Sequence, residues 1–294
     1  MIWAGITVAL VGALGYAVGA ALQQYEVVRG GATLKLVRRP RWFIGGVVGL
    51  AGAVLHALAL ALAPLVIVQP VSVTTLVFAV PLAALLHGRR PSKQEVIGSI
   101  AVAGGLLGLM MLIPHDDVRP ELSTSAALWF LACVGAVAGI CEVAARRFQG
   151  PARALVLSIG AGAVTAAVST FVRVVGGGLE GDLSRLIHWF TLVIPALLLL
   201  AIVLLQRSYA VGCFGIAYAG VQVVDPITSI IAGVVLLGEP LPMSTHAAPA
   251  LLFGAILIAG TVILGRLSPD TAHPHRPPDL PLPVPATPTR AGAR

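Results

Sequence analysis

A single carboxylate lies in the middle of a long apolar segment, in the stretch GVQVVDPITS from Gly220 to Ser229. An ionised aspartate at the centre of a membrane-spanning helix costs about 2.5 to 3.5 kcal/mol on insertion scales, so such a residue normally faces a cavity or a partner. Pro226 has no backbone donor and leaves a carbonyl one turn back without its helical hydrogen bond. We therefore expect a bent or broken helix at Pro226, with Asp225 lining a solute pathway.

A second polar residue followed by proline, Gln69 before Pro70, occurs in the segment IVQPVSVTT. Two helix breaks in corresponding helices of a repeat indicate a substrate site near the membrane midplane. We expect two sets of side chains to line this site: Asp225, Gln222, Thr228, Ser229 and Tyr218 from one helix, and Gln69, Ser72, Thr74 and Thr75 from the other. The alternatives are hydroxyl bonds to the local backbone, an Asp225 that caps a helix, and a Tyr218 that fills the core.

Three titratable groups could couple transport to protons: Asp225, His56 and Glu142. The alternative for Glu142 is an ion pair with Arg146 one turn later, and for His56 a hydrogen bond to a neighbouring backbone. The sequence has no Walker-type phosphate loop, paired catalytic aspartates, His-Glu-x-x-His segment or nucleophile elbow. We therefore expect a secondary transporter that is not an enzyme and needs no cofactor. A non-transporting membrane scaffold is the alternative of another class.

The elements that would position these residues follow from composition, which is 57% hydrophobic and 11% charged with a mean hydropathy of +0.95. A helix needs about 20 apolar residues to cross the hydrocarbon core. Nine windows fit this length, and they run approximately over residues 2–22, 42–62, 65–87, 96–113, 122–145, 154–172, 187–206, 213–237 and 248–265. Because these runs are continuously apolar, they predict an all-α membrane protein and not a β-barrel.

The distribution of positive charge predicts the orientation. Of the 19 Lys and Arg residues, 16 fall in alternate loops and the C-terminal tail, and the remaining three are Arg119, Arg173 and Arg185. Cytoplasmic loops are enriched in positive charge, so we expect the N-terminus outside and the C-terminus in the cytoplasm, in the plasma membrane. The formal net charge of +7 then reflects topology, and no nucleic-acid partner is expected.

The last 27 residues, 268–294, contain eight prolines and almost no large apolar side chain, so they predict a disordered cytoplasmic tail after a membrane domain at 1–267. The three cysteines lie in apolar windows and are expected to pack in the core. Small residues at spacing four predict close helix contacts, within the chain or in a homodimer. These pairs are Gly15 and Gly19, Gly45 and Gly49, Gly104 and Gly108, and Gly135 and Gly139.

Two segments have a similar layout, at about 42–113 and 187–266. Each has a helix, a long helix with a polar-proline step, a short turn with glycine, and a shorter glycine-rich helix. The turns read HGRRPS and LGEPLP. By the charge count the first segment leaves the cytoplasm and the second returns to it, so we expect inverted units, as in many secondary transporters.

The pattern resembles the drug/metabolite transporter superfamily, whose EamA-like repeats end in a Gly-Glu turn after a long helix, here GVVLLGEP at Gly233 to Pro240. The first half, with LAPLVIVQPVSVTTLVFAVPLAALLHG from Leu62 to Gly88, is also similar to the NIPA-type magnesium transporters, which have nine helices. The resemblance implies transport of a small organic metabolite or a cation. The magnesium alternative would make Asp225 a metal ligand. One departure is Arg89, which follows Gly88 where the family often has glutamate, so a symmetric pair of glutamates is not implied.

Overall fold

The computed structural model describes residues 2–62, 65–112, 122–176, 188–237 and 247–267. The predicted tail at 268–294 and most of the LGEPLP turn lie outside these ranges. Within them the chain forms nine α-helices and two short 3₁₀ turns, and no strand. Their bounds are α1 Ile2–Gly30, η1 Leu34–Arg38, α2 Pro40–Leu62, α3 Leu65–Leu86, α4 Lys93–Met111, α5 Thr124–Ala144, η2 Ala145–Arg147, α6 Gly150–Gly176, α7 Trp189–Tyr209, α8 Phe214–Leu237 and α9 Ala247–Gly265. Each helix covers one predicted window, so the all-α prediction is confirmed.

Seven of the helices in the described ranges are long and apolar enough to cross a membrane: α1, α4, α5, α6, α7, α8 and α9. In α3 the described apolar part is shorter, Val73–Leu86. Large apolar side chains point outward on several helices; Leu192, Val235 and Leu251 are each more than 70% exposed. Such surfaces are unfavourable in water and match lipid chains, so the fold is that of a multi-pass membrane protein.

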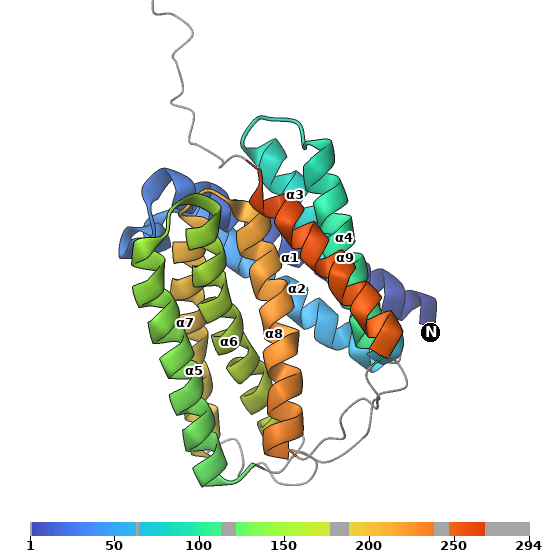
Figure 1. Cartoon of the computed structure of the whole chain (residues 1–294), viewed down its shortest axis with the longest axis vertical. Helices are drawn as coiled ribbons and strands as arrows, with labels where there is room; N and C mark the ends of the chain where they lie inside the picture. Colours follow the sequence, from blue (N-terminus) through green and yellow to red (C-terminus); the bar gives the residue numbers. More distant parts are fainter. Residues whose placement is uncertain (1, 63–64, 113–121, 177–187, 238–246, 268–294) are drawn as a thin grey trace, which may run out of the picture.

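The packing partners of the helices repeat with an offset of five (Figure 1). α1 packs against α2 and α3, and α6 packs in the same way against α7 and α8. α3 then contacts α4 as α8 contacts α9, while the pairs α4 with α9 and α3 with α8 join the two groups. The predicted units correspond to α2–α4 and α7–α9, and this pattern adds α1 and α6. Because the offset is odd, equivalent helices run in opposite directions when consecutive helices are antiparallel.

The turns after α1, α3, α5 and α7 lie at the same end of the bundle, at the top of Figure 1. Their described residues, at 31–39, 87–92, 145–149 and 210–213, together with the adjacent helix ends, hold most of the positive charge that the structure places. We call this the basic end. The sequence predicted such a gathering of charge, and the side of the membrane that it faces stays a prediction.

Glycine pairs allow close contact in two places. A Cβ on Gly19 of α1 would lie 2.6 Å from the carbonyl oxygen of Gly45 of α2, and on Gly108 of α4 it would overlap the ring of Phe253 of α9. The predicted contact face of α1 with α2 is confirmed. On α4 the prediction is confirmed for Gly108 and is wrong for Gly104, where a Cβ would meet nothing within 4 Å. A Cβ on Gly135 or Gly139 of α5 would meet nothing within 4 Å, so this pair does not serve packing within the described chain. A homodimer contact there stays a prediction.

Two clusters of buried side chains hold the bundle together. The first joins α1, α3, α7 and α8 around Leu76, Tyr209 and Phe214, and the second joins α5, α6 and α7 around Phe130 and Phe171. Phe171 is completely buried and contacts the ring of Phe190, with centroids 5.3 Å apart. Of the cysteines, Cys141 and Cys213 are buried as predicted. Cys133 is exposed on α5, so its predicted core position is wrong.

Candidate functional site

Four polar side chains form a stripe along α8. Tyr218, Gln222, Asp225 and Ser229 are spaced i, i+4, i+7 and i+11, which places them on one face of the helix. Tyr218 is only 9% exposed, whereas the other three are partly accessible. The Ser229 hydroxyl donates a hydrogen bond to Asp225 Oδ1 over 3.3 Å. This stripe, which we call the α8 polar stripe, contains four of the predicted site residues.

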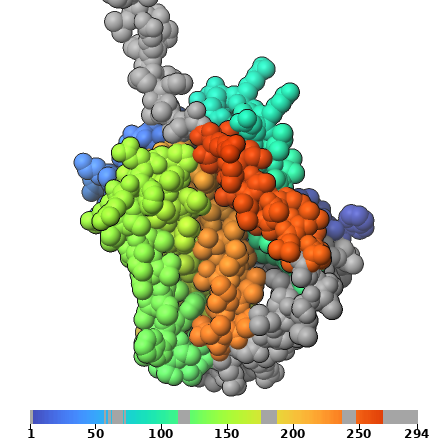
Figure 2. Space-filling model, viewed as in Figure 1, coloured from blue at the N-terminus to red at the C-terminus, as the bar shows by residue number. Residues whose placement is uncertain are grey.

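The opposite face of α8 explains where the stripe points. Ile227, Ile231 and Val235 lie on that face and are 43%, 57% and 73% exposed. Figure 2 shows the surface of α8 exposed between α5 and α9. Higher on the helix, Val224 on the same side packs against α6, where a Cβ on Gly162 would lie 2.8 Å from the Val224 Cβ. Because the exposed residues of α8 lie on the opposite face and Tyr218 on the stripe is buried, we infer that the α8 polar stripe points towards the interior of the bundle.

The upper end of the stripe is aromatic. The ring of Tyr218 stacks on Phe214 at 5.4 Å, and Phe214 meets Tyr209 edge-on at 5.2 Å. Tyr16 of α1 and Tyr209 of α7 also lie near Tyr218. The ring of Tyr218 therefore fills the core, as the alternative reading of this residue expected, while its position on the stripe is retained.

The predicted break at Pro226 is not present. α8 is a single helix from Phe214 to Leu237 with Pro226 inside it. The helix continues across Pro226, although proline cannot donate to the carbonyl four residues back, which belongs to Gln222. Gln222 thus brings both a side-chain amide and a backbone carbonyl without a helical donor to the same level of α8. α3 is likewise one helix from Leu65 to Leu86, across Pro70.

The α3 half of the predicted site is described only in part, because the side chains of Gln69, Pro70 and Ser72 lie outside the described residues. The Thr74 hydroxyl donates to the carbonyl of Val71 in its own helix, as the local-backbone alternative expected. Thr75 is buried at 3% exposure. The two helices do meet, since Val73 of α3 and Val223 of α8 belong to one apolar cluster. Thr228 is partly buried on α8, one residue before Ser229.

The other predicted proton carriers lie away from the stripe. Glu142 of α5 pairs with Arg207 of α7, with 2.7 Å between carboxylate and guanidinium. The predicted partner Arg146 was therefore wrong, because Arg146 lies in η2, after α5 has ended, while α7 brings Arg207 alongside. His56 lies on α2 where that helix crosses α1, with its backbone next to Gly12.

A second polar cluster, which the sequence analysis missed, lies at the basic end. Nε2 of His87, after α3, lies 2.9 Å from the amide oxygen of Gln24 of α1, so the ring N–H donates to it. The amide nitrogen of Gln206 of α7 donates to the amide oxygen of Gln23 over 2.9 Å. We call these two contacts the amide ties. One tie joins α1 to the residue after α3, within the same packing group. The other joins α1 to α7 of the second packing group. The sequence signal for this polar cluster is the run Gln23-Gln24-Tyr25-Glu26, which follows a long apolar segment.

The amide ties are not fully satisfied. Gln24 is completely buried and Gln206 is 5% exposed, yet Gln24 Nε2 and Gln206 Oε1 have no hydrogen-bond partner within the described structure. Tyr209 is also completely buried, and its hydroxyl likewise has no hydrogen-bond partner within the described structure. Buried polar atoms without partners are rare and generally mark bound water, a ligand or a second conformation.

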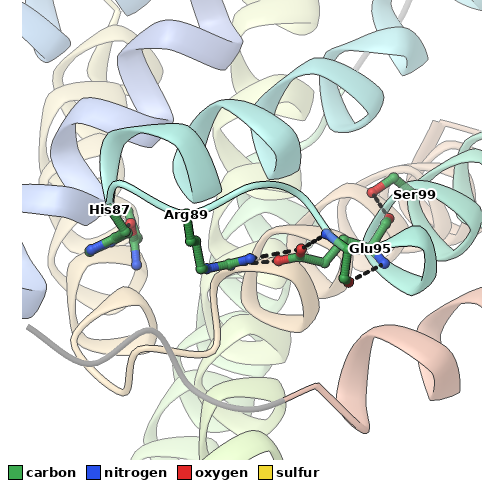
Figure 3. Close-up of polar contacts among 6 residues, drawn as sticks. His87, Arg89, Glu95 and Ser99 are labelled. Atoms are coloured by element: carbon green, nitrogen blue, oxygen red, sulfur yellow. Dashed lines mark hydrogen bonds and ion pairs between the residues drawn. The ribbon is translucent and has the colours of Figure 1, made fainter.

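Next to the amide ties, the α3–α4 turn has a rigid polar structure (Figure 3). Arg89 donates two hydrogen bonds to the Glu95 carboxylate, at 2.6 and 2.8 Å. Ser92 and Glu95 form a reciprocal capping box at the start of α4, and the Ser99 hydroxyl donates to the Glu95 carbonyl. Arg89, which departs from the family pattern, thus neutralises a buried carboxylate.

The described residues contain no group of three or more His, Cys, Asp or Glu side chains that could hold a metal ion. Asp225 contacts the hydroxyl of Ser229 and shares a face of α8 with the amide of Gln222. This set of donors and acceptors suits a polar organic molecule, since these groups can all hydrogen-bond to amines, amides and hydroxyls.

The chain is similar to an uncharacterised protein of Corynebacterium glutamicum, with 24% identity over 254 residues, which is 82% of this chain and 84% of that protein. No protein-family model matches the chain, and no solved structure matches it. The similarity spans most of both chains. It carries no activity with it, so the function is argued from the α8 polar stripe and the packing of the helices.

Proposed function

We propose that the protein is a secondary transporter that moves a small polar organic solute across the membrane by alternating access. The observation that carries the proposal is Asp225, which lies inside a spanning helix and on its inward face. A carboxylate inside a spanning helix, with one hydroxyl partner among the described residues, is costly in a bundle that serves only packing. Its cost is offset when water or a polar solute reaches it, and the partial accessibility of Gln222, Asp225 and Ser229 supports such access.

The repeated packing pattern supports the same proposal. Secondary transporters commonly bind solute between two inverted units and expose the site to each side by moving one unit against the other. α8 contacts α3 and α4 of the first group as well as its own group, so the α8 polar stripe lies near the junction. We include nine membrane spans, an outer N-terminus, a cytoplasmic C-terminus and membership of the drug/metabolite transporter superfamily in this proposal.

The amide ties would then close the pathway at the basic end. They connect α1 to α3 and α7 through neutral amide and imidazole groups, which separate at a lower cost than a buried ion pair. The atoms left without partners on Gln24 and Gln206 would bind water when the ties open. Asp225 is the group that would carry a coupling proton, because the other candidate acid, Glu142, is held by Arg207.

The test is binding followed by uptake. Purified protein in detergent is screened by thermal unfolding against amines, amino acids, nucleosides, sugars and Mg²⁺, because a ligand of the folded state raises the unfolding temperature. Each hit is then assayed for uptake into proteoliposomes with imposed pH gradients. Asp225→Asn keeps the side-chain volume and removes the charge. Thr228→Val on α8 has a matched control in Thr261→Val on α9, where the hydroxyl bonds its own helix.

We expect one organic class to stabilise the wild type, and Asp225→Asn to lower its apparent affinity at least tenfold, the equivalent of about 1.4 kcal/mol. Thr228→Val should weaken binding more than Thr261→Val. Stabilisation by Mg²⁺ alone would favour the magnesium alternative. If no solute is taken up and Asp225→Asn only raises the unfolding temperature, the protein is a packed scaffold and the proposal fails.

A further inference from the structure

The turn between α1 and α2 carries an unusual arrangement of arginines. The guanidinium carbon of Arg29, at the end of α1, lies 4.1 Å from the centroid of the Tyr25 ring. That of Arg41, at the start of α2, lies 5.8 Å from the same centroid. Tyr25 is 8% exposed, and its ring contacts the ring of His87, with centroids 5.3 Å apart. One buried aromatic ring therefore gathers two cations from the two ends of the turn.

These two cations have no counter-charge in the described chain. The nearby carboxylate, Glu26, is bonded to Arg39 at 3.0 Å, and the Arg39 guanidinium packs against Gly30. Neither Arg29 nor Arg41 has a carboxylate partner within the described residues. Cation–π attraction stabilises each of them on Tyr25, but two guanidinium groups held at 4.1 and 5.8 Å from one ring centroid repel one another, and a nearby anion would offset this repulsion. Guanidinium groups match phosphate oxygens in geometry as well as in charge.

The same turn presents apolar side chains outward. In η1, Leu34 is 91% exposed and Val37 is 58% exposed, while Leu36 between them is buried and fixes the turn to the bundle. Lys35 and Arg38 alternate with these residues and are also exposed. A short segment that combines exposed leucine and valine with lysine and arginine is suited to the boundary between lipid headgroups and acyl chains. Trp42, next to Arg41, is a residue type typical of that boundary.

We propose that this turn binds the headgroup of an anionic phospholipid, with its phosphate at Arg29 and Arg41 and its acyl chains beside Leu34 and Val37. Charge complementarity and the apolar side chains together indicate a lipid, because a free phosphate would use the arginines alone. The bound lipid would hold the α1–α2 turn against the membrane, next to the amide ties. The inference does not depend on the transport proposal.

The test uses Trp42 as a reporter. Trp3, Trp129 and Trp189 are replaced by phenylalanine, and the protein is placed in phosphatidylcholine nanodiscs with a small fraction of brominated phosphatidylglycerol or brominated phosphatidylcholine. Bromine quenches tryptophan at short range, so binding of the anionic lipid increases quenching of Trp42. The variant is the double substitution Arg29→Gln and Arg41→Gln. The matched control is Arg146→Gln and Arg147→Gln, two exposed arginines at the same basic end.

We expect stronger quenching by the phosphatidylglycerol probe than by the phosphatidylcholine probe. The Arg29 and Arg41 variant should lower the apparent affinity for phosphatidylglycerol on the order of tenfold, while the control pair changes it less than twofold. Leu34→Ser with Val37→Ser should weaken binding with the arginines intact. Thermal unfolding of each variant without anionic lipid tests whether it folds. The double substitution Arg29→Lys and Arg41→Lys keeps both charges and should lower the affinity for phosphatidylglycerol less than the glutamine pair does.

Equal quenching by the two lipids, or equal losses in the variant and the control pair, would overturn the proposal. Soluble glycerol phosphate distinguishes the two phosphate sources. If millimolar glycerol phosphate displaces the quenching lipid and the Leu34 and Val37 changes have no effect, the site binds a free phosphate and the lipid assignment is wrong. No transported solute is present in these measurements, so a failure here leaves the transport proposal unaffected, and the reverse also holds.

Discussion

Asp225 and the amide ties show two ways in which single polar residues are retained in an apolar bundle. Asp225 keeps a charge-bearing group on an inward face with one hydroxyl partner, Ser229. The amide ties use neutral groups that bond across helices, which in membrane proteins contributes about 0.6 kcal/mol per pair on average. The first arrangement is poorly compensated and therefore points to a ligand, whereas the second is a modest structural contact that can open.

At the residue scale, the tie between Gln23 and Gln206 can be measured by a double-mutant cycle. Gln206→Leu leaves the amide of Gln23 without its donor and should lower the free energy of unfolding by about 1 kcal/mol. Gln23→Leu should have a similar effect. The double substitution should cost less than the sum, with a coupling of about 0.6 kcal/mol, because the second change removes a group that is already unpaired. Strictly additive losses would mean that the two amides do not interact.

At the element scale, the contact between α4 and α9 depends on one glycine of an adjacent pair. A Cβ on Gly105 would lie 2.7 Å from the backbone nitrogen of Leu257 and from the carbonyl oxygen of Phe253. A Cβ on Gly104 would meet nothing within 4 Å. The helix backbones touch at Gly105, so the approach of α4 to α9 requires the absence of a side chain there.

We therefore expect Gly105→Ala to destabilise the protein by about 1 to 3 kcal/mol, because backbone atoms cannot yield as a flexible side chain would. Gly104→Ala, one residue earlier, should be neutral or slightly stabilising, since alanine has the higher helix propensity. Thermal or denaturant unfolding in detergent measures both. Equal effects of the two substitutions would show that α4 and α9 are not packed as described.

At the scale of the whole molecule, the alternation of nine helices places the turns after α1, α3, α5 and α7 together at the basic end. Lys35, Lys93 and Gln149 are exposed near this end, and Ser123 is exposed at the start of α5, at the opposite end. Positive charge is retained on the cytoplasmic side during insertion, so the basic end should face the cytoplasm.

Single cysteines test this arrangement in a background without Cys133, Cys141 and Cys213. A membrane-impermeant thiol reagent applied to intact cells should label Ser123→Cys, and should label Lys35→Cys, Lys93→Cys and Gln149→Cys only after the cells are opened. Labelling of all three basic-end positions from outside would invert the orientation and keep the fold. Labelling of Lys35→Cys and Lys93→Cys from opposite sides would contradict the nine-span topology.

Much of the candidate site could be located from the sequence, because the α8 polar stripe is a local pattern in one helix. The residues that surround the stripe could not be predicted from the sequence. Tyr218 is in the core because Phe214, Tyr209 and Tyr16 come from three different helices, and Glu142 pairs with Arg207 because α7 passes α5. Gln24 and His87 are 63 residues apart, and their contact depends on the packing of α1 against α3.

Hydropathy and charge patterning alone determined that the chain is helical and built for a membrane, because an apolar run of spanning length can satisfy its backbone only within its own helix. They located every helix to within a few residues, except that α1 continues to Gly30, eight residues past its apolar window. The tertiary structure decided that extension. Gln23, Gln24 and Glu26 are polar in sequence, but they bond to Gln206 of α7, to His87 after α3 and to Arg39 before α2, and Gln24 and Glu26 are buried there. Contacts between helices depend on side chains far apart in the chain, and no local pattern specifies them.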